Sequence, residues 1–238
     1  MVFSNYNRFL IGLLLVITVL ISYFLNLDHL LLIIIIFLVT YDLNNLKITN
    51  SIYLITLLII TIFLIFFSTY QLFTSLYILE TFLIILFFLN MKLKKEIFLF
   101  SIYIFCLILF YIINVNRDIF YLIILISFFN DTIAYISGKK LGGPLITPII
   151  SPNKTWSGTT ISFVFTTTAL FLLNFNIFLS ATISIFLFLG DIFFSYIKRL
   201  LDIKDFSLLL GGHGGILDRL DSMFFVAIIF QFYLVIFL

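Results

Sequence analysis

The sequence predicts an all-α, polytopic integral membrane protein with about nine transmembrane helices. Hydrophobic residue types make up 63% of the 238 residues and charged types only 10%, whereas a soluble domain carries about 25% charged residues. Because this number of charged residues cannot cover a water-facing surface, lipid is the expected solvent for most of the chain. The apolar residues also fall into runs that approach or exceed the length of a bilayer span, about 20 residues with about 17 as the lower limit.

The first run follows Arg8, and we interpret it as a retained helix because no small-x-small cleavage site of a signal peptide follows it. The second run is short, and we expect it to be re-entrant or tilted with extended ends. The nine expected spans are residues 9–25, 29–41, 52–68, 72–90, 97–115, 119–137, 159–174, 177–197 and 222–238.

The basic residues predict the orientation of these spans, because cytoplasmic loops of membrane proteins are enriched in Lys and Arg. With a cytoplasmic N-terminus, every Lys and Arg except Arg117 falls in a cytoplasmic segment. The C-terminus is then expected outside. The net charge of +2 is too small to indicate a nucleic-acid partner. Cys106 is the sole cysteine, so an internal disulfide is excluded, and its apolar surroundings predict a buried, inert thiol.

Two carboxylates fall inside expected spans. Glu80 lies in the fourth run and Asp131 in the sixth. An intramembrane carboxylate is costly and is therefore a functional candidate. For Glu80 the alternative is a protonated or hydrogen-bonded group between helices. For Asp131 we expect a cation or a hydrogen-bond donor to face it, and a salt bridge to a neighbouring helix explains it equally well.

The stretch from Ser151 to Gly158 carries the signals of a helix start. Pro152 interrupts any preceding helix, and Ser, Thr and Gly then come before the next apolar run. The free N–H groups at such a start favour anions, and Lys154 adds a positive charge. The alternative is an ordinary loop with a helix cap and Trp156 as an interfacial anchor.

The richest polar stretch lies between Gly190 and Ser222. At 3.6 residues per turn, one helical face carries Asp191, Ser195, Lys198 and Asp202. Asp218 and Asp221 are three apart and are expected on one face at the start of the last helix. A glycine-rich turn, Gly211–Gly215, separates the two helices and could bring these faces together.

Carboxylates at the inner ends of two helices make a plausible Mg²⁺ site, because Mg²⁺ prefers oxygen ligands and keeps places for water and phosphate. Lys198, Arg199 and Arg219 suit phosphate oxygens. The backbone N–H groups of Gly211–Gly215 can approach an anion closely. A solvated ion-pair loop is the alternative, but such a loop has no need of carboxylates aligned inside an apolar run.

These motifs resemble the phosphatidate cytidylyltransferase family. The resemblance lies in Ser195–Arg199, in Lys204-Asp205 and in the segment His213–Asp221, with matching spacing, and in earlier motifs around Asp131 and Ser151–Gly158. The departures are Asn153 for a common basic residue, Ser157 for a common acidic one, Gly211 for a usual proline, and a shortened segment after Gly138.

The resemblance implies a homodimeric, Mg²⁺-dependent enzyme of the bacterial inner membrane that makes CDP-diacylglycerol from CTP and phosphatidic acid. Asp191 and Asp218 would be the principal metal ligands and Asp221 a further ligand or a partner of the ligands, with K⁺ as a candidate second cation. The residues expected to bind or orient substrate phosphates are Ser151, Lys154, Ser195, Lys204, Asp205, His213, Gly214 and Gly215. For His213 a purely structural turn role is nearly as plausible.

We accordingly divide the chain into residues 1–115, a scaffold that offers dimer contacts, and residues 116–238, a catalytic region facing the cytoplasm. Two alternative functions are consistent with many of the same sequence features. A cytidylyltransferase for another lipid phosphate would carry the same motifs, and an ion-coupled transporter would also place carboxylates in the membrane. A transporter, however, needs polar residues through the full depth of the bilayer, whereas these cluster on one side. The intact acidic and basic set argues against an inactive relative.

Overall fold

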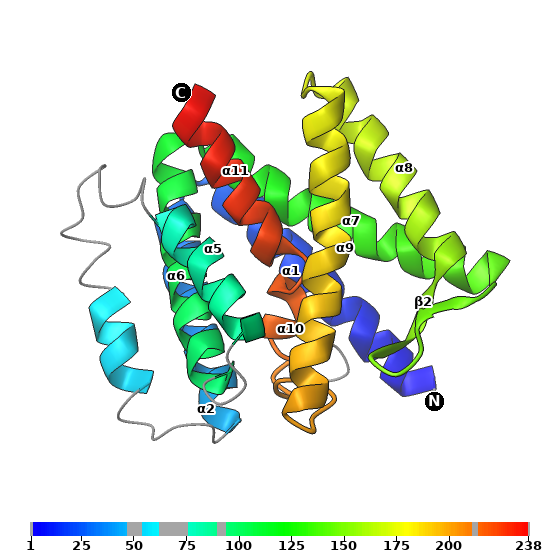
Figure 1. The fold of residues 1–238 in the computed structure, drawn as a ribbon, viewed down its shortest axis with the longest axis horizontal. Coiled ribbons are helices and arrows are strands. Elements are labelled where there is room, and N and C mark those ends of the chain that lie inside the picture. The colour runs from blue at the N-terminus through cyan, green and yellow to red at the C-terminus, as the bar shows by residue number, and fades with distance from the viewer. Residues whose placement is uncertain (1, 47–53, 62–75, 90–93, 211–213, 238) are drawn as a thin grey trace. The chain divides into compact units, whose positions relative to one another are not determined.

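The computed structural model describes all residues except 1, 47–53, 62–75, 90–93, 211–213 and 238. It is mostly helical, as the composition predicts, and Figure 1 follows the chain through its elements. The chain forms two compact units. Unit 1 contains residues 1–121, 205–219 and 230–238, and unit 2 contains residues 122–204 and 220–229.

Unit 1 is built around α6 (Lys94–Val115), which packs against α2 (Asp28–Asn45) and α5 (Leu76–Leu89). α1 (Val2–Phe24) packs against α2, and residues 54–61 form a further helical stretch. Side chains on all sides of α6 are buried, as expected for a helix that is apolar all round. Cys106 is among them with no exposed surface, which confirms the buried thiol. Glu80 of α5 is also fully buried.

Arg117 joins the α1–α2 turn to the start of α7 (Arg117–Leu141). Its guanidinium forms a salt bridge with Asp28 at 3.2 Å and donates hydrogen bonds to the carbonyl oxygen of Tyr23 at 2.6 Å and to the side chain of Asn26. The Tyr121 hydroxyl donates to the same Asp28 oxygen at 2.6 Å. The one basic residue outside the predicted cytoplasmic segments is therefore neutralised by a buried carboxylate.

Unit 2 holds most of α7, a two-stranded hairpin and the helix pair α8 (Trp156–Leu172) and α9 (Ile177–Leu200). α8 and α9 lie side by side (Figure 1) and share a hydrogen bond of 3.0 Å between Thr167 and Ser184. Thr166 of α8 donates to Asn130 of α7 at 3.2 Å. These buried polar contacts fix the three helices against one another, because an unpaired hydroxyl or amide here would be costly.

The hairpin is the element that the sequence did not predict. β1 (Leu145–Thr147) pairs antiparallel with β2 (Ser151–Thr155). Proline cannot donate to a strand ladder and is tolerated where only one side of a strand is paired, as in this two-stranded sheet. The expected interruption at Pro152 is confirmed, but the interrupting segment is extended instead of being an irregular loop.

The chain ends with a four-residue turn of helix, α10 (Leu217–Leu220), and then α11 (Met223–Phe237). The first turn of α11 packs against α9 through aromatic rings: Phe224 stacks on Phe193 at 5.9 Å between centroids and meets Phe194 edge-on at 5.4 Å. This packing fixes the residues just before α11 against the part of α9 that carries Gly190 and Asp191.

Among the described residues, four helices are long and apolar enough to cross a bilayer: α2, α6, α7 and α9. Residues 13–24, 78–89 and 223–236 form shorter apolar helices. The second expected span is longer than predicted, because the helix continues through polar residues at both ends, from Asp28 to Asn45. The third expected span and the start of the fourth lie largely outside the described residues.

Candidate active site

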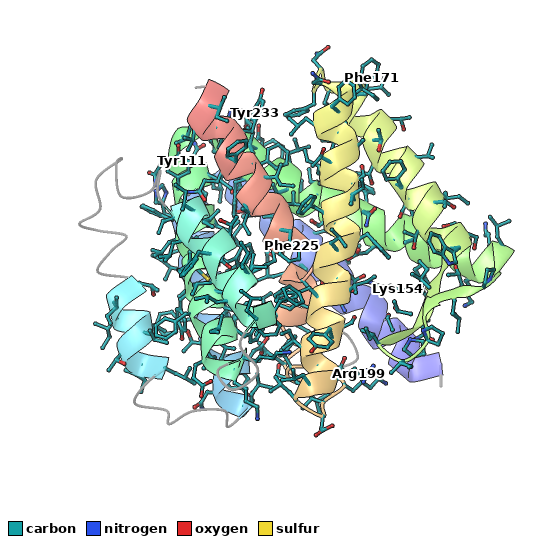
Figure 2. The ribbon with its side chains drawn as sticks, in the orientation of Figure 1. Tyr111, Lys154, Phe171, Arg199, Phe225 and Tyr233 are labelled. Carbon is teal, nitrogen blue, oxygen red and sulfur yellow. The ribbon has the colours of Figure 1, made fainter. Side chains whose placement is uncertain are left out.

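Lys154 and Asp191 form the central ion pair of unit 2. Lys154 comes from strand β2 and Asp191 from the middle of α9, and the ammonium group contacts the carboxylate directly. Both side chains are partly buried, which strengthens their attraction over that of a surface pair. Figure 2 shows Lys154 on the hairpin strand and Arg199 near the C-terminal end of α9. The hairpin thus supplies a cation to the helix that carries the expected metal ligand.

Asp221 lies in the same unit and is buried. Burial raises the pKa of its carboxyl well above the ordinary value, and the neighbouring carboxylates of Asp191 and Asp131 raise this pKa further, while Lys198 and Lys154 lower it. Three acidic and two basic groups therefore interact in one place. We call these five residues the charged cluster.

The main chain at Asp221 and Ser222 is held against α9. A Cβ on Gly190 would stand 2.5 Å from the carbonyl oxygen of Asp221, so only glycine permits this approach. The Asp221 carboxylate accepts a hydrogen bond from the backbone N–H of Ser222 at 2.8 Å, and the Ser222 hydroxyl donates to Asp131 at 3.5 Å. The expected donor to Asp131 is thus a serine at the start of α11.

The helix start predicted after Pro152 is confirmed. Thr155 is the N-cap of α8, and its hydroxyl accepts from the backbone N–H of Gly158 at 3.2 Å. Gly158 passes close to α7, where an added Cβ would stand 2.5 Å from the carbonyl oxygen of Ala134. Two N–H groups at this helix start already have acceptors, because Trp156 donates to the carbonyl oxygen of Pro144 at 3.1 Å and Gly158 donates to Thr155.

The other predicted residues of unit 2 differ in exposure. Ser195 is buried in α9, one turn after Asp191, and Ser151 pairs with Thr147 at the start of β2. Arg199 is exposed and donates to the carbonyl oxygens of Ile150 at 3.2 Å and Ile203 at 3.3 Å, and Lys204 is exposed beyond α9.

In unit 1, the side chain of Asp218 accepts hydrogen bonds from two residues that precede it in the chain, Phe206 and Gly215. One of its carboxylate oxygens accepts from the backbone N–H of Phe206 at 3.0 Å and from that of Gly215 at 2.9 Å. Gly214 has a φ of +78°, and a Cβ there would stand 2.6 Å from the same oxygen. Arg219 is exposed and Asp205 is half-buried. His213 lies outside the described residues.

Two details of the expected geometry were wrong. Asp218 and Asp221 do not lie in one continuous helix, because α10 ends at Leu220 and α11 begins at Met223. The close approach at Gly190 requires the chain to turn at this point. Asp202 does not continue the polar face of α9, because the helix ends at Leu200 and Asp202 has a φ of +57°.

Sequence reasoning missed Asp42. This residue lies in the last turn of α2 and has no exposed surface. Its two carboxylate oxygens accept from the hydroxyl of Ser207 at 2.6 Å and from the backbone N–H of Leu217 at 2.9 Å. The available signal was a lone acidic residue at the end of the second apolar run.

The acidic residues suit Mg²⁺ in their chemistry, since carboxylate oxygens are its preferred protein ligands. The repulsion between Asp131, Asp191 and Asp221 is the kind of strain that a divalent cation relieves. However, the part of the chain that the structure describes has no group of three or more His, Cys, Asp or Glu residues placed to hold a metal ion. Asp191 is instead paired with Lys154. The magnesium site therefore stays a prediction.

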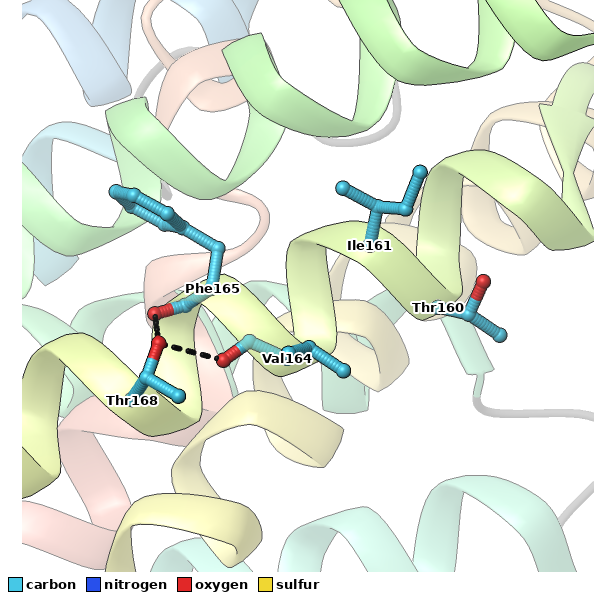
Figure 3. A pocket seen from close by; sticks show the side chains of 5 residues that line it. All are labelled: Thr160, Ile161, Val164, Phe165 and Thr168. Carbon is cyan, nitrogen blue, oxygen red and sulfur yellow. Dashed lines mark hydrogen bonds between the residues drawn. The ribbon is translucent and has the colours of Figure 1, made fainter.

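A shallow groove that no charged residue lines runs along one face of α8. Figure 3 shows its lining side chains, which are Thr160, Ile161, Val164, Phe165 and Thr168. The Thr168 hydroxyl donates to the carbonyl oxygens of Val164 at 2.8 Å and Phe165 at 2.9 Å. Such a threonine has satisfied its hydrogen bond within its own helix, so this face is compatible with lipid.

Comparison with known proteins identifies the family. Residues 6–237 match the model of the cytidylyltransferase family. The chain belongs to this family. The identity expected from the motifs is confirmed, and the match extends through the N-terminal half, for which the motifs gave no evidence.

The relatives of this family member include phosphatidate cytidylyltransferases. That of Rickettsia bellii (strain RML369-C) is 40% identical over 121 residues, which are 43% of this chain and 51% of the relative. A putative phosphatidate cytidylyltransferase of Mycoplasma pneumoniae is 37% identical over 172 residues, covering 49% of this chain and 43% of the relative. That of Staphylococcus aureus (strain COL) is 42% identical over 112 residues, covering 43% of each chain. The matched part spans about half the length of each relative.

Proposed function

We propose that this cytidylyltransferase transfers the cytidylyl group of CTP to phosphatidic acid, giving CDP-diacylglycerol and pyrophosphate for phospholipid synthesis. The observation that carries the proposal is the charged cluster of unit 2, in a chain whose relatives are named for this reaction. Acidic and basic groups gathered among apolar helices suit a reaction between a nucleotide and a lipid phosphate.

Charge compensation is the first requirement of this reaction. CTP carries about four negative charges near pH 7 and phosphatidate adds one to two, since the second pKa of a phosphate monoester is about 6. Lys154, Lys198 and Arg199 supply positive charge in unit 2, and Arg219 supplies it in unit 1. Mg²⁺, when bound through Asp191, Asp218 and Asp221, would neutralise the triphosphate and stabilise charge that develops during transfer.

The chemical step needs no protein nucleophile, because the lipid phosphate is already largely ionised at pH 7. Its oxygen attacks the α-phosphorus of CTP in line. A new phosphorus–oxygen bond forms as the bond to the β-phosphate breaks, and pyrophosphate leaves with that electron pair. The task left to the side chains is positioning and charge stabilisation.

The remaining predicted residues take roles in binding. Ser151 lies on the strand that carries Lys154, and its hydroxyl suits a phosphate oxygen. Ser195 and Lys204 extend this polar surface along and beyond α9, and Gly214 and Gly215 provide close backbone approach. Asp205 and His213 would orient these groups or the nucleotide.

We place the enzyme in the bacterial inner membrane as a homodimer with about nine spans, a cytoplasmic N-terminus and a cytoplasm-facing site. The clustering of basic residues in alternate segments supports this orientation. K⁺ is proposed as a companion of Mg²⁺. The acyl chains of the substrate would stay in lipid while its phosphate reaches the charged cluster.

A direct assay tests the proposal. Purified protein in detergent or lipid receives CTP labelled in its cytosine ring, phosphatidic acid and Mg²⁺, and the organic phase is examined for a labelled lipid. The expected product requires both substrates. Parallel reactions with other lipid phosphates separate phosphatidic acid from related acceptors, and the absence of labelled lipid with every acceptor would reject the activity.

A further inference from the structure

Two carboxylates of unit 1, the buried Asp42 and the half-buried Asp218, accept hydrogen bonds from both sides of the segment 206–217, whose described residues are 206–210 and 214–217. Asp218 accepts the backbone N–H groups of Phe206 and Gly215. Asp42 accepts the hydroxyl of Ser207 and the backbone N–H of Leu217. Each carboxylate therefore accepts one hydrogen bond from the start of the segment, at Phe206 or Ser207, and one from its end, at Gly215 or Leu217.

The glycines of this segment lie between the same two carboxylates. A Cβ on Gly214 would stand 2.6 Å from an oxygen of Asp218, and a Cβ on Gly215 would stand 2.3 Å from an oxygen of Asp42 and 2.8 Å from the hydroxyl of Ser207. The backbone thus passes so close to Asp42 and Asp218 that a larger residue at Gly214 or Gly215 would have to displace these carboxylates. The contact at Leu217, the residue before Asp218, comes from Asp42 of α2, 175 residues before Leu217 in the chain.

We propose that Asp42 is a positioning residue of the transfer reaction, which anchors the segment Phe206–Leu217 from α2 and so fixes the carboxylate of Asp218. This inference rests on the proposed function and extends it to a residue in the N-terminal half. The hydrogen bonds that Asp42 accepts are the reason for its effect, because the buried donors of Ser207 and Leu217 lose their acceptor when this side chain is removed. Residues of this kind typically change metal affinity or activity by about 10- to 100-fold.

Two substitutions of Asp42 distinguish an anchoring role from a general contribution to the stability of the fold. Asp42→Ala removes both acceptors, whereas Asp42→Asn can still accept from Leu217 while its amide donates to the hydroxyl of Ser207. We therefore expect Asp42→Ala to raise the half-saturating Mg²⁺ concentration by about tenfold, and Asp42→Asn to recover much of the loss. Asp28→Ala is the matched control, since Asp28 is a second buried carboxylate of α2 whose partners are Arg117 and Tyr121. It should lower thermal stability and leave the Mg²⁺ dependence unchanged.

A second readout does not depend on activity. Leu208 is 79% exposed and adjoins Ser207, and the sole cysteine, Cys106, is fully buried. Leu208→Cys therefore provides one accessible thiol for a nitroxide spin label, whose motion reports how firmly the segment is held. Asp42→Ala in this background should increase label mobility, and Asp28→Ala should not.

The outcomes are distinguishable. If labelled CTP gives no lipid product with the parent protein, the proposed function fails, and the spin label alone then decides whether Asp42 anchors the segment. Unchanged label mobility and unchanged Mg²⁺ dependence in folded Asp42→Ala protein would overturn the inference. A loss of activity that is equal in Asp42→Ala and Asp42→Asn would overturn it too, because the charge of Asp42 and not its anchoring contacts would then matter.

Discussion

Gly190 of α9 lies against the main-chain carbonyl oxygen of Asp221, at a distance where a Cβ would stand 2.5 Å from that oxygen. The approach brings the turn before α11 onto the helix that carries Asp191, the residue that follows Gly190. Asp221 and Asp191 consequently interact, together with Asp131, in the interior of unit 2. A single glycine thus permits the gathering of these acidic side chains.

We expect Gly190→Ala to weaken both folding and transfer. The added methyl group meets backbone, which cannot rotate away, so overpacking should cost roughly 1–3 kcal/mol. The turn at Asp221 and Ser222 must move away from α9, which separates Asp221 from Asp191. Thermal unfolding in detergent measures the first effect, and the Mg²⁺ dependence of cytidylyl transfer measures the second.

Gly158→Ala provides the control, because its Cβ would stand 2.5 Å from the carbonyl oxygen of Ala134. That clash is of the same kind but lies between α7 and α8. Gly158→Ala should destabilise the protein to a similar degree without a specific change in Mg²⁺ dependence. If Gly190→Ala and Gly158→Ala showed the same Mg²⁺ dependence, Gly190 would have no specific effect on the metal site.

The Lys154–Asp191 ion pair leads to a second prediction. Lys154→Met should lower the turnover number by about 10²-fold, the usual effect of losing one group that stabilises developing charge. The half-saturating Mg²⁺ concentration should fall at the same time, because the lysine and the metal ion compete for the carboxylate of Asp191. Steady-state kinetics over a range of Mg²⁺ concentrations measures both quantities.

Lys154→Arg keeps the charge and should retain more activity than Lys154→Met. Lys139→Met removes an exposed lysine from the end of α7 and should leave the kinetics unchanged. If Lys154→Met lowered turnover but raised the Mg²⁺ requirement, Lys154 would be supporting the metal site and not competing with it.

The sequence predicted the parts of this fold that depend on local pattern. Apolar runs gave the helices, and Pro152 followed by Ser, Thr and Gly gave the start of α8, because caps and helix breakers act over a few residues. The spacing of Asp191, Ser195 and Lys198 gave one polar face of α9. Each of these features is set within about one turn or one loop.

Long-range contacts were not predictable in this way. Nothing near Asp42 in the sequence indicates that it accepts hydrogen bonds from Ser207 and Leu217, because the contact depends on how α2 packs in unit 1. The break between α10 and α11 was missed for the same reason, since its cause is the approach of the chain to Gly190. Asp202 was misplaced because the periodicity of α9 was continued past Leu200.

The salt bridge between Arg117 and Asp28 allows a third prediction. Arg117→Ala and Asp28→Ala should each lower the free energy of unfolding by about 1–2 kcal/mol, between the values of exposed and buried pairs, because the arginine is one-third exposed and Asp28 nearly buried. The double variant should lose less than the sum of the two. The free energy of unfolding is measured in detergent for the parent protein, the two single variants and the double variant, and the departure from additivity gives the interaction free energy of the pair. Strictly additive losses would show that the two residues stabilise the fold independently.

The last prediction concerns the two aspartates on either side of Leu220. Asp218→Asn should abolish transfer in purified protein without preventing membrane insertion, because Asp218 is an expected principal metal ligand. Loosening of the segment is expected only in Asp218→Ala, because Phe206 and Gly215 donate to one oxygen of Asp218, which the carbonyl oxygen of asparagine can replace. Asp221→Asn should leave that segment intact, since the Asp221 carboxylate accepts from Ser222 instead. A spin label on Leu208→Cys distinguishes the two positions: its mobility should rise in Asp218→Ala and stay unchanged in Asp218→Asn and Asp221→Asn. Asp221→Asn should retain some transfer and need more Mg²⁺ for it. Full activity of Asp218→Asn with Mg²⁺ present would remove Asp218 from the metal site and leave it as a structural anchor.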